Sequence, residues 1–126
     1  MQKIILITPT HLRKERMGYL KELSGIFSQV ENLLWLVCED GIRKHDNVEE
    51  LLQRSGIDYK YFNYGPTNNW GECQRDFLCE YVFRHDINGV CYFADDDNWW
   101  DIKIFDEIRK TKRVGVFPVG NRGPSN

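Results

Sequence analysis

The stretch Val90–Asn98, VCYFADDDN, joins an apolar run to three consecutive aspartates. An apolar run of this length is typical of a buried strand, so Asp95, Asp96 and Asp97 are expected together at the strand's carboxyl end, where open α/β sheets bind their ligands. Three adjacent carboxylates repel one another, and a hard cation such as Mg²⁺ or Mn²⁺, shared with phosphate oxygens, relieves that repulsion. A solvated turn or helix N-cap is the simpler interpretation of an acidic triplet. A solvated turn requires neither the apolar run before the triplet nor the tryptophan pair at 99–100, so these two features favour a ligand site.

Strand and helix patterns alternate along the chain on both sides of this stretch. Besides the strand that begins at Val90, strands are predicted at Lys3–Thr8, Leu33–Cys38, Ile57–Tyr61 and Val114–Val119, and helices at Arg13–Val30, Asp46–Ser55, about Gly71–His85 and Ile102–Arg109. We expect Pro9 to close the first strand, and Asp46 and Gly56 to cap the second helix. Alternation of this kind predicts an α/β fold with an open, doubly wound, mostly parallel, Rossmann-like sheet.

The totals limit the class of protein. The 126 residues predict one domain over residues 1–120, followed by a short irregular tail at 121–126. A net charge of −2 argues against nucleic acid as the main partner. The four cysteines form no CxxC pair, which favours reduced, mostly buried thiols. The spacing of the cysteines and histidines does not match a zinc site. No apolar run is long enough for a signal peptide or membrane span, so a complete chain is expected in the cytoplasm.

The common phosphate-binding fingerprints are missing. Neither GxGxxG nor GxxxxGK[ST] occurs, so a bound phosphate is expected to be held through a metal. A second acidic strand end, Glu39–Asp40, lies before Gly41 and adds carboxylates to the same edge of the predicted sheet.

Five blocks of the sequence together resemble the β-1,3-glucuronyltransferase family. In the order of the family they are Thr8–Arg13, Leu34–Asp40, Gly71–Arg75, Val90–Asn98, and Phe105–Arg109 continued by Val116–Gly120. The resemblance implies a glycosyltransferase-A fold and a UDP-glucuronic acid donor with Mn²⁺ (or Mg²⁺). It also implies transfer of the sugar with inversion at the anomeric carbon.

The resemblance gives each aspartate of the triplet a separate role. It implies that Asp97 is the direct metal ligand, that Asp96 contacts the ribose hydroxyls, and that Asp95 faces the sugar and neighbouring basic groups.

It also implies donor contacts outside the triplet. Asp40 accepts from the uracil N–H, His11 stacks on uracil beside Pro9, and Arg75 reaches the donor's charged groups. A carboxylate can accept the imide proton and a ring can stack on a base. The simpler alternatives are an ordinary turn at Asp40, a solvated His11, and a surface ion pair of Arg75 with Glu72 or Asp76.

The chain also departs from the family pattern. Trp70 stands where the family commonly has an arginine, and Trp99 and Trp100 replace a smaller polar residue and a tyrosine. The family's glutamate general base and diphosphate-binding histidine come from an acceptor-binding half that follows the block ending at Gly120. We therefore assign no catalytic residue.

Three functions are compatible with the sequence. The first is an inverting glycosyltransferase with a UDP-sugar donor and a carbohydrate or other hydroxyl acceptor, in the Golgi lumen if the chain is a fragment of an anchored enzyme. The second is a non-catalytic nucleotide-sugar-binding module. The third, a Mg²⁺-dependent phosphoryl-transfer domain, needs a nucleophilic aspartate after the first strand, where the chain has Thr8–Thr10. An exposed sheet edge also favours self-association.

Overall fold

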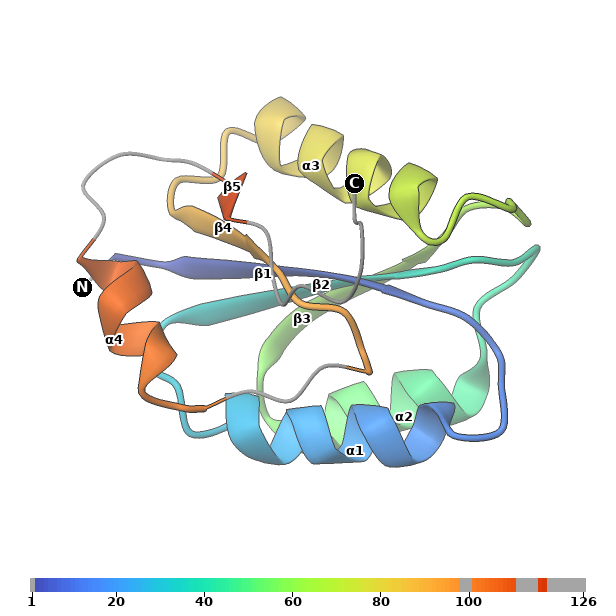
Figure 1. The fold of residues 1–126 in the computed structure, drawn as a ribbon, viewed down its shortest axis with the longest axis horizontal. Coiled ribbons are helices and arrows are strands. Elements are labelled where there is room, and N and C mark those ends of the chain that lie inside the picture. The colour runs from blue at the N-terminus through green and yellow to red at the C-terminus, as the bar shows by residue number, and fades with distance from the viewer. Residues whose placement is uncertain (1, 98–100, 111–115, 118–126) are drawn as a thin grey trace.

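The computed structural model describes residues 2–97, 101–110 and 116–117 (Figure 1). Its strands are β1 (Ile4–Thr10), β2 (Leu33–Glu39), β3 (Asp58–Asn63), β4 (Val90–Phe93) and β5 (Val116–Phe117). Its helices are α1 (Arg16–Phe27), α2 (Asp46–Ser55), α3 (Glu72–Arg84) and α4 (Ile104–Arg109). All strand pairs are parallel, in the order β3-β2-β1-β4-β5. This confirms the predicted open α/β sheet.

The strand order reverses beside β1. The chain moves outward from β1 to β2 and β3, then crosses to the other side of β1 to form β4. Ile4 pairs with Val90 and Ile7 with Phe93, so the carboxyl ends of β1 and β4 are neighbours. This junction is the topological switch point, where open α/β sheets bind ligands.

Helices cover both faces of the sheet (Figure 1). On one face α1, α2 and α4 bury Phe27, Leu52 and Phe105 in the larger apolar core; on the other, α3 packs Leu78 and Val82 on the smaller core. All seven residues of β1 are buried because both of its faces are covered. The central strand therefore supplies a rigid base for the residues that follow its carboxyl end.

The expectation that Pro9 closes the first strand is wrong, since β1 continues to Thr10. The Ile7 carbonyl accepts from the Ala94 N–H, and the Thr10 carbonyl accepts from the Asp40 N–H. The backbone polar groups of successive residues point to opposite sides of a strand, so the nitrogen of Pro9 faces β4, as the Ile7 carbonyl does. The pairing of β1 with β4 ends at Ile7. Its missing N–H removes no ladder hydrogen bond, so proline is tolerated there.

Helix bounds differ from the apolar pattern mainly at α1. The pattern predicts a helix over Arg13–Val30, but α1 begins at Arg16 and ends at Phe27. The N–H groups of Gln29 and Val30 donate to carbonyls three residues earlier in the chain. Val30 still packs against the core, so apolar spacing continues past the end of the helix. Likewise α4 begins at Ile104 rather than Ile102, after a turn in which Asp101 accepts the Lys103 N–H.

The other predicted bounds agree more closely. Gly56 ends α2 in the left-handed conformation, as predicted, whereas Asp46 is the first helical residue and His45 holds the N-cap position. β3 lies at 58–63, one to two residues later than expected, and the rest of the strand expected around β5 lies outside the described residues. No helix in the described ranges has the length and apolar character to span a membrane.

Candidate functional site

The candidate site lies at the carboxyl ends of β1 and β4. Thr10 ends β1, and the aspartate triplet follows β4 after Phe93 and Ala94. The Thr8 hydroxyl donates to the Ala94 carbonyl at 2.6 Å, which fixes the chain just before the triplet. The aspartates therefore start from a defined position at the switch point.

Asp96 is buried and paired with a cation. Its side chain accepts from Arg13 Nη2 at 2.7 Å and Nη1 at 3.2 Å, and from the Thr10 hydroxyl at 2.7 Å. Burial acts to lower the pKa of Arg13, but the hydrogen bond and attraction to Asp96 outweigh burial, so the pKa lies above its ordinary value. The Arg13 guanidinium also lies 5.3 Å from the ring centre of Tyr19. Asp96 is thus held by β1 and by the turn before α1.

Asp95 is paired with a different arginine. Arg75, near the start of α3, donates from Nη2 to both carboxylate oxygens at 2.8 and 3.0 Å. Its Nη1 donates to the Trp70 carbonyl at 3.4 Å. Arg75 therefore pairs across the site rather than along its own helix.

Asp97 is the exposed member of the triplet. Its charge contributes to the raised pKa of Arg13. Within the described ranges, no group of three or more His, Cys, Asp and Glu side chains could hold a metal ion. An exposed carboxylate such as that of Asp97 is the type of ligand with which Mg²⁺ commonly binds beside phosphate oxygens.

Asp40 organises the loop between β3 and α3. Its carboxylate accepts from the Thr67 N–H at 2.7 Å and from the Thr67 hydroxyl at 3.1 Å. Gly65 faces the same carboxylate so closely that a Cβ there would lie 2.5 Å from Oδ1. Asp40 therefore holds two loops together, which is more than an isolated turn requires.

The remaining predicted contacts lie beside β1. Pro9 is buried, and a Cβ on Gly71, which has a φ of +85°, would meet its ring at 3.0 Å. His11 is exposed, with Nδ1 3.4 Å from Arg13 Nη1. Trp70 is 95% exposed, whereas Trp99 and Trp100 lie outside the described residues.

Sequence reasoning missed the groups that neutralise this acidic edge. Arg13 stands in a block that resembles the family, but the sequence pattern assigns no role to it and does not predict the pair formed by Arg16 and Glu39. That pair is buried, with each side chain 1% exposed. Buried carboxylates require cations or several hydrogen bonds, and this rule points to the arginines just after β1.

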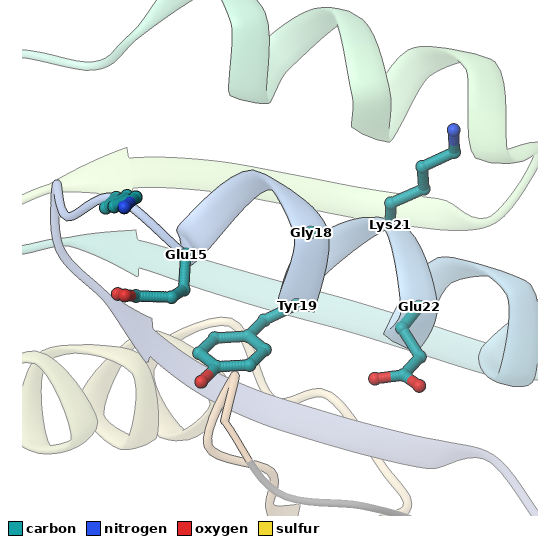
Figure 2. A pocket seen from close by; sticks show the side chains of 6 residues that line it. Glu15, Gly18, Tyr19, Lys21 and Glu22 are labelled. Carbon is teal, nitrogen blue, oxygen red and sulfur yellow. The ribbon is translucent and has the colours of Figure 1, made fainter.

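An open groove of about 550 Å³ lies along α1 (Figure 2). Its lining residues all come from the start of α1 and the turn before it: Lys14, Glu15, Gly18, Tyr19, Lys21 and Glu22. Tyr19 connects the groove to the site through its contact with Arg13.

The four cysteines form no disulfide bond. All four are free thiols; Cys38 and Cys91 are buried and Cys73 and Cys79 half-buried. Burial, aided by the neighbouring charges of Glu39 and Asp40, raises the pKa of Cys38 to about 12. Burial likewise raises the pKa of Cys91 to about 11. Neither buried thiol is suited to act as a thiolate nucleophile near neutral pH.

Comparisons with known proteins agree with the resemblance. The sequence profile of glycosyltransferase family 43 matches residues 23–125. Galactosylgalactosylxylosylprotein 3-beta-glucuronosyltransferase P of Drosophila melanogaster is 38% identical over 126 residues, covering 93% of this chain and 26% of that protein. Galactosylgalactosylxylosylprotein 3-beta-glucuronosyltransferase 1 of Homo sapiens is 31% identical, covering 92% of this chain and 40% of that protein.

A plant relative carries a different activity in its name. Probable beta-1,4-xylosyltransferase GT43E of Oryza sativa subsp. japonica is 30% identical, covering 92% of this chain and 27% of that protein. The chain thus spans between about a quarter and two fifths of the length of these relatives. Because the family profile covers most of its residues, this chain belongs to glycosyltransferase family 43.

Proposed function

We propose that the protein is an inverting glycosyltransferase whose donor, a UDP-sugar such as UDP-glucuronate, binds at the carboxyl ends of β1 and β4. The observation that carries the proposal is the triplet itself: Asp95 and Asp96 are each paired with an arginine, and the exposed Asp97 follows them. Two fixed carboxylates and one accessible carboxylate at a switch point suit a polar nucleotide with a cation. The names of the relatives support sugar transfer.

Asp97 is the residue that would hold Mn²⁺ or Mg²⁺. Once bound, the metal would act as a Lewis acid that stabilises the departing diphosphate. Asp97 suits this role because it is the exposed aspartate of the triplet, whereas Asp96 is buried and Asp95 half-buried.

The other residues would orient the donor. Asp96 receives three hydrogen bonds, and a carboxylate offers about four acceptor sites, so one is left for a ribose hydroxyl. Asp40 would accept the uracil N–H with lone pairs that Thr67 does not use. His11, which is exposed just after β1, would stack on the uracil ring beside Pro9.

The pair of Arg75 and Asp95 would lie at the sugar end of the donor. In the reaction, an acceptor hydroxyl oxygen bonds to the anomeric carbon as the bond from that carbon to the diphosphate breaks. The electron pair goes to UDP, and a base takes the hydroxyl proton. The residues assigned here hold and orient the donor, and none of them is assigned as that base.

Titration with UDP in the presence and absence of Mn²⁺ tests donor binding. UDP with Mn²⁺ is expected to raise the unfolding midpoint, because a ligand at 100 times its Kd stabilises the folded state by about 2.7 kcal/mol. UDP without metal, and ADP with Mn²⁺, are the controls and are expected to have much weaker effects. Equal midpoints with and without UDP and Mn²⁺ would contradict the proposal.

A transfer assay separates the enzyme from the module. Release of UDP from UDP-glucuronate or UDP-xylose, measured with and without hydroxyl acceptors, is expected if the protein transfers sugar. Metal-dependent UDP binding without release would instead favour the non-catalytic nucleotide-sugar-binding module.

A further inference from the structure

A buried ion pair lies directly behind the candidate site. Arg16 is the first residue of α1 and Glu39 the last residue of β2, and each side chain is 1% exposed. Arg16 Nη1 lies 2.6 Å from Oε1 and 2.7 Å from Oε2 of Glu39. The Tyr61 hydroxyl donates to Oε1 at 2.6 Å, and His45 Nε2 lies 3.7 Å from Oε2.

Stability alone does not account for this pair. Moving two charges out of water costs several kcal/mol for each ion, and an apolar pair of similar volume is often as stable or more stable. Arg16 also places a cation at the positive end of α1, whose first turn carries no acidic residue. Among the described residues, its Nε and Nη2 atoms have no hydrogen-bond partner, which adds a further cost.

The geometry connects the pair to Asp96 by two routes. The first runs along the turn before α1: the Arg16 N–H donates to the Arg13 carbonyl at 3.2 Å, and the Arg13 guanidinium holds both oxygens of Asp96. The second runs through the sheet: Glu39 is the register partner of Thr10, whose hydroxyl donates to Asp96. Arg16 Nη1 itself lies 3.5 Å from that hydroxyl.

We propose that the Arg16–Glu39 pair is a positioning device for the donor site. It fixes the start of α1 against the ends of β1 and β2, and so holds Arg13 and Thr10 in the geometry that orients Asp96. The inference rests on the proposed function and adds residues that would not touch the nucleotide. Its effect on affinity comes from preorganisation, because a site held in its binding geometry loses less entropy when ligand binds.

The double substitution Arg16→Met with Glu39→Leu tests this role. It removes both charges together and leaves apolar side chains in their place, so the protein is expected to keep its fold. The unfolding midpoint is expected to fall only by the effect of the Tyr61 hydroxyl, which loses its acceptor. The Kd for UDP with Mn²⁺ is expected to increase by about tenfold, the order found when groups supporting a ligand shell are removed. A fold that is kept while affinity falls is a result that a purely structural role does not produce.

The matched control is Arg54→Met with Glu50→Leu. This pair has the same charges in an i, i+4 arrangement on α2, but its side chains are 78% and 61% exposed. It is expected to leave the Kd for UDP unchanged, because exposed pairs contribute little and this one has no contact with the site.

A double-mutant cycle shows whether the pair acts through Arg13. In an Arg13→Ala background, the Met/Leu substitution is expected to change the Kd less than it does when Arg13 is present, because the route through Arg13 is already lost and only the route through Thr10 remains. If the Met/Leu protein does not fold, Tyr61→Phe removes one donor from Glu39 without a change in charge. That variant is expected to weaken UDP binding by about threefold.

Two results would overturn the inference while leaving the proposed function intact. One is an unchanged Kd in the Met/Leu protein or, where that protein does not fold, in Tyr61→Phe. The other is the same loss of affinity with and without Arg13. Absence of UDP binding by the unaltered protein would overturn the proposed function and this role with it.

Discussion

Asp95 and Asp96 are neighbours in the chain but are neutralised by arginines from different parts of it. Arg13 comes from the turn after β1, and Arg75 comes from the first turns of α3. Adjacent residues at the end of a strand point in different directions, so one cation does not serve both. At the residue scale, protein cations therefore relieve part of the repulsion that the acidic triplet predicts, and Asp97 is the carboxylate most exposed to an external cation.

The substitution Asp97→Ala is predicted to abolish Mn²⁺-dependent binding of UDP while the fold is kept. An exposed carboxylate contributes little to folding, so the free energy of unfolding is expected to change by less than about 0.5 kcal/mol. Calorimetric titration of UDP with Mn²⁺ and urea unfolding give the two measurements. Asp76→Ala, an exposed aspartate on α3, is the control, and wild-type metal affinity in Asp97→Ala would remove Asp97 from the metal site.

At the element scale, the start of α1 is the part of the fold that the site depends on. Its first residue is tied to β2 through Glu39, and the turn before it carries Arg13. Phe27 at the other end of α1 packs edge-on against Trp35 and Phe105, with ring centres 5.0 and 5.8 Å apart. The helix is thus anchored at both ends, which limits its movement relative to the sheet.

Two glycines allow a test of local backbone energetics with opposite signs. Gly25→Ala in α1 is predicted to stabilise the fold by roughly 0.5–1 kcal/mol, because alanine is the better helix former and nothing lies within 4 Å of a Cβ there. Gly56→Ala is predicted to destabilise it by about 1 kcal/mol, because Gly56 has a φ of +75° after α2.

Both glycine variants are compared by urea unfolding at neutral pH. Their sites are equally open, so they differ mainly in backbone conformation. A change of the same sign in both would show that local conformation does not control stability at these positions.

At the scale of the whole molecule, the buried thiols predict loss of stability at alkaline pH. The pKa of Cys38 is raised to about 12 and that of Cys91 to about 11, chiefly by burial. In the unfolded chain a thiol has a pKa of about 8.5, so above that pH the folded state binds more protons than the unfolded state does. The stabilising contribution is complete below about pH 8.5 and is lost as pH rises toward 11.

Urea unfolding at pH 8 and pH 10 is expected to reveal this loss, up to about 2 kcal/mol for each buried thiol. The variant with Cys38→Ala and Cys91→Ala is expected to have a smaller pH dependence over the same interval. An equal pH dependence in the two proteins would contradict the assignment to these thiols.

Self-association also belongs to the whole molecule and stays a prediction. β3 is an edge strand of the sheet, and Trp70 and Phe83 are 95% and 84% exposed. Unpaired strand edges and exposed apolar side chains favour contact between copies. Sedimentation velocity is expected to give a mean mass that rises with protein concentration, whereas a constant monomer mass from micromolar to millimolar concentration would count against association.

Local sequence patterns were enough to predict the architecture and to mark a candidate site. Alternating apolar periods predicted strands and helices, and the acidic end of the Val90–Phe93 strand marked the ligand edge, because these patterns depend on local periodicity and on which residues follow a strand. The predicted ends of strands and helices were less accurate, as at Pro9 and Val30, because apolar packing and backbone hydrogen bonding do not end at the same residue.

The pairing of charges depends on the folded structure. Arg13 meets Asp96 across 83 positions of the chain, Arg75 meets Asp95 across 20, and Arg16 meets Glu39 across 23. Many arginines and carboxylates could pair by sequence alone, and the choice among them is made when the carboxyl ends of β2, β1 and β4 come side by side. An ion pair depends on distance in space and on burial, which local periodicity does not specify.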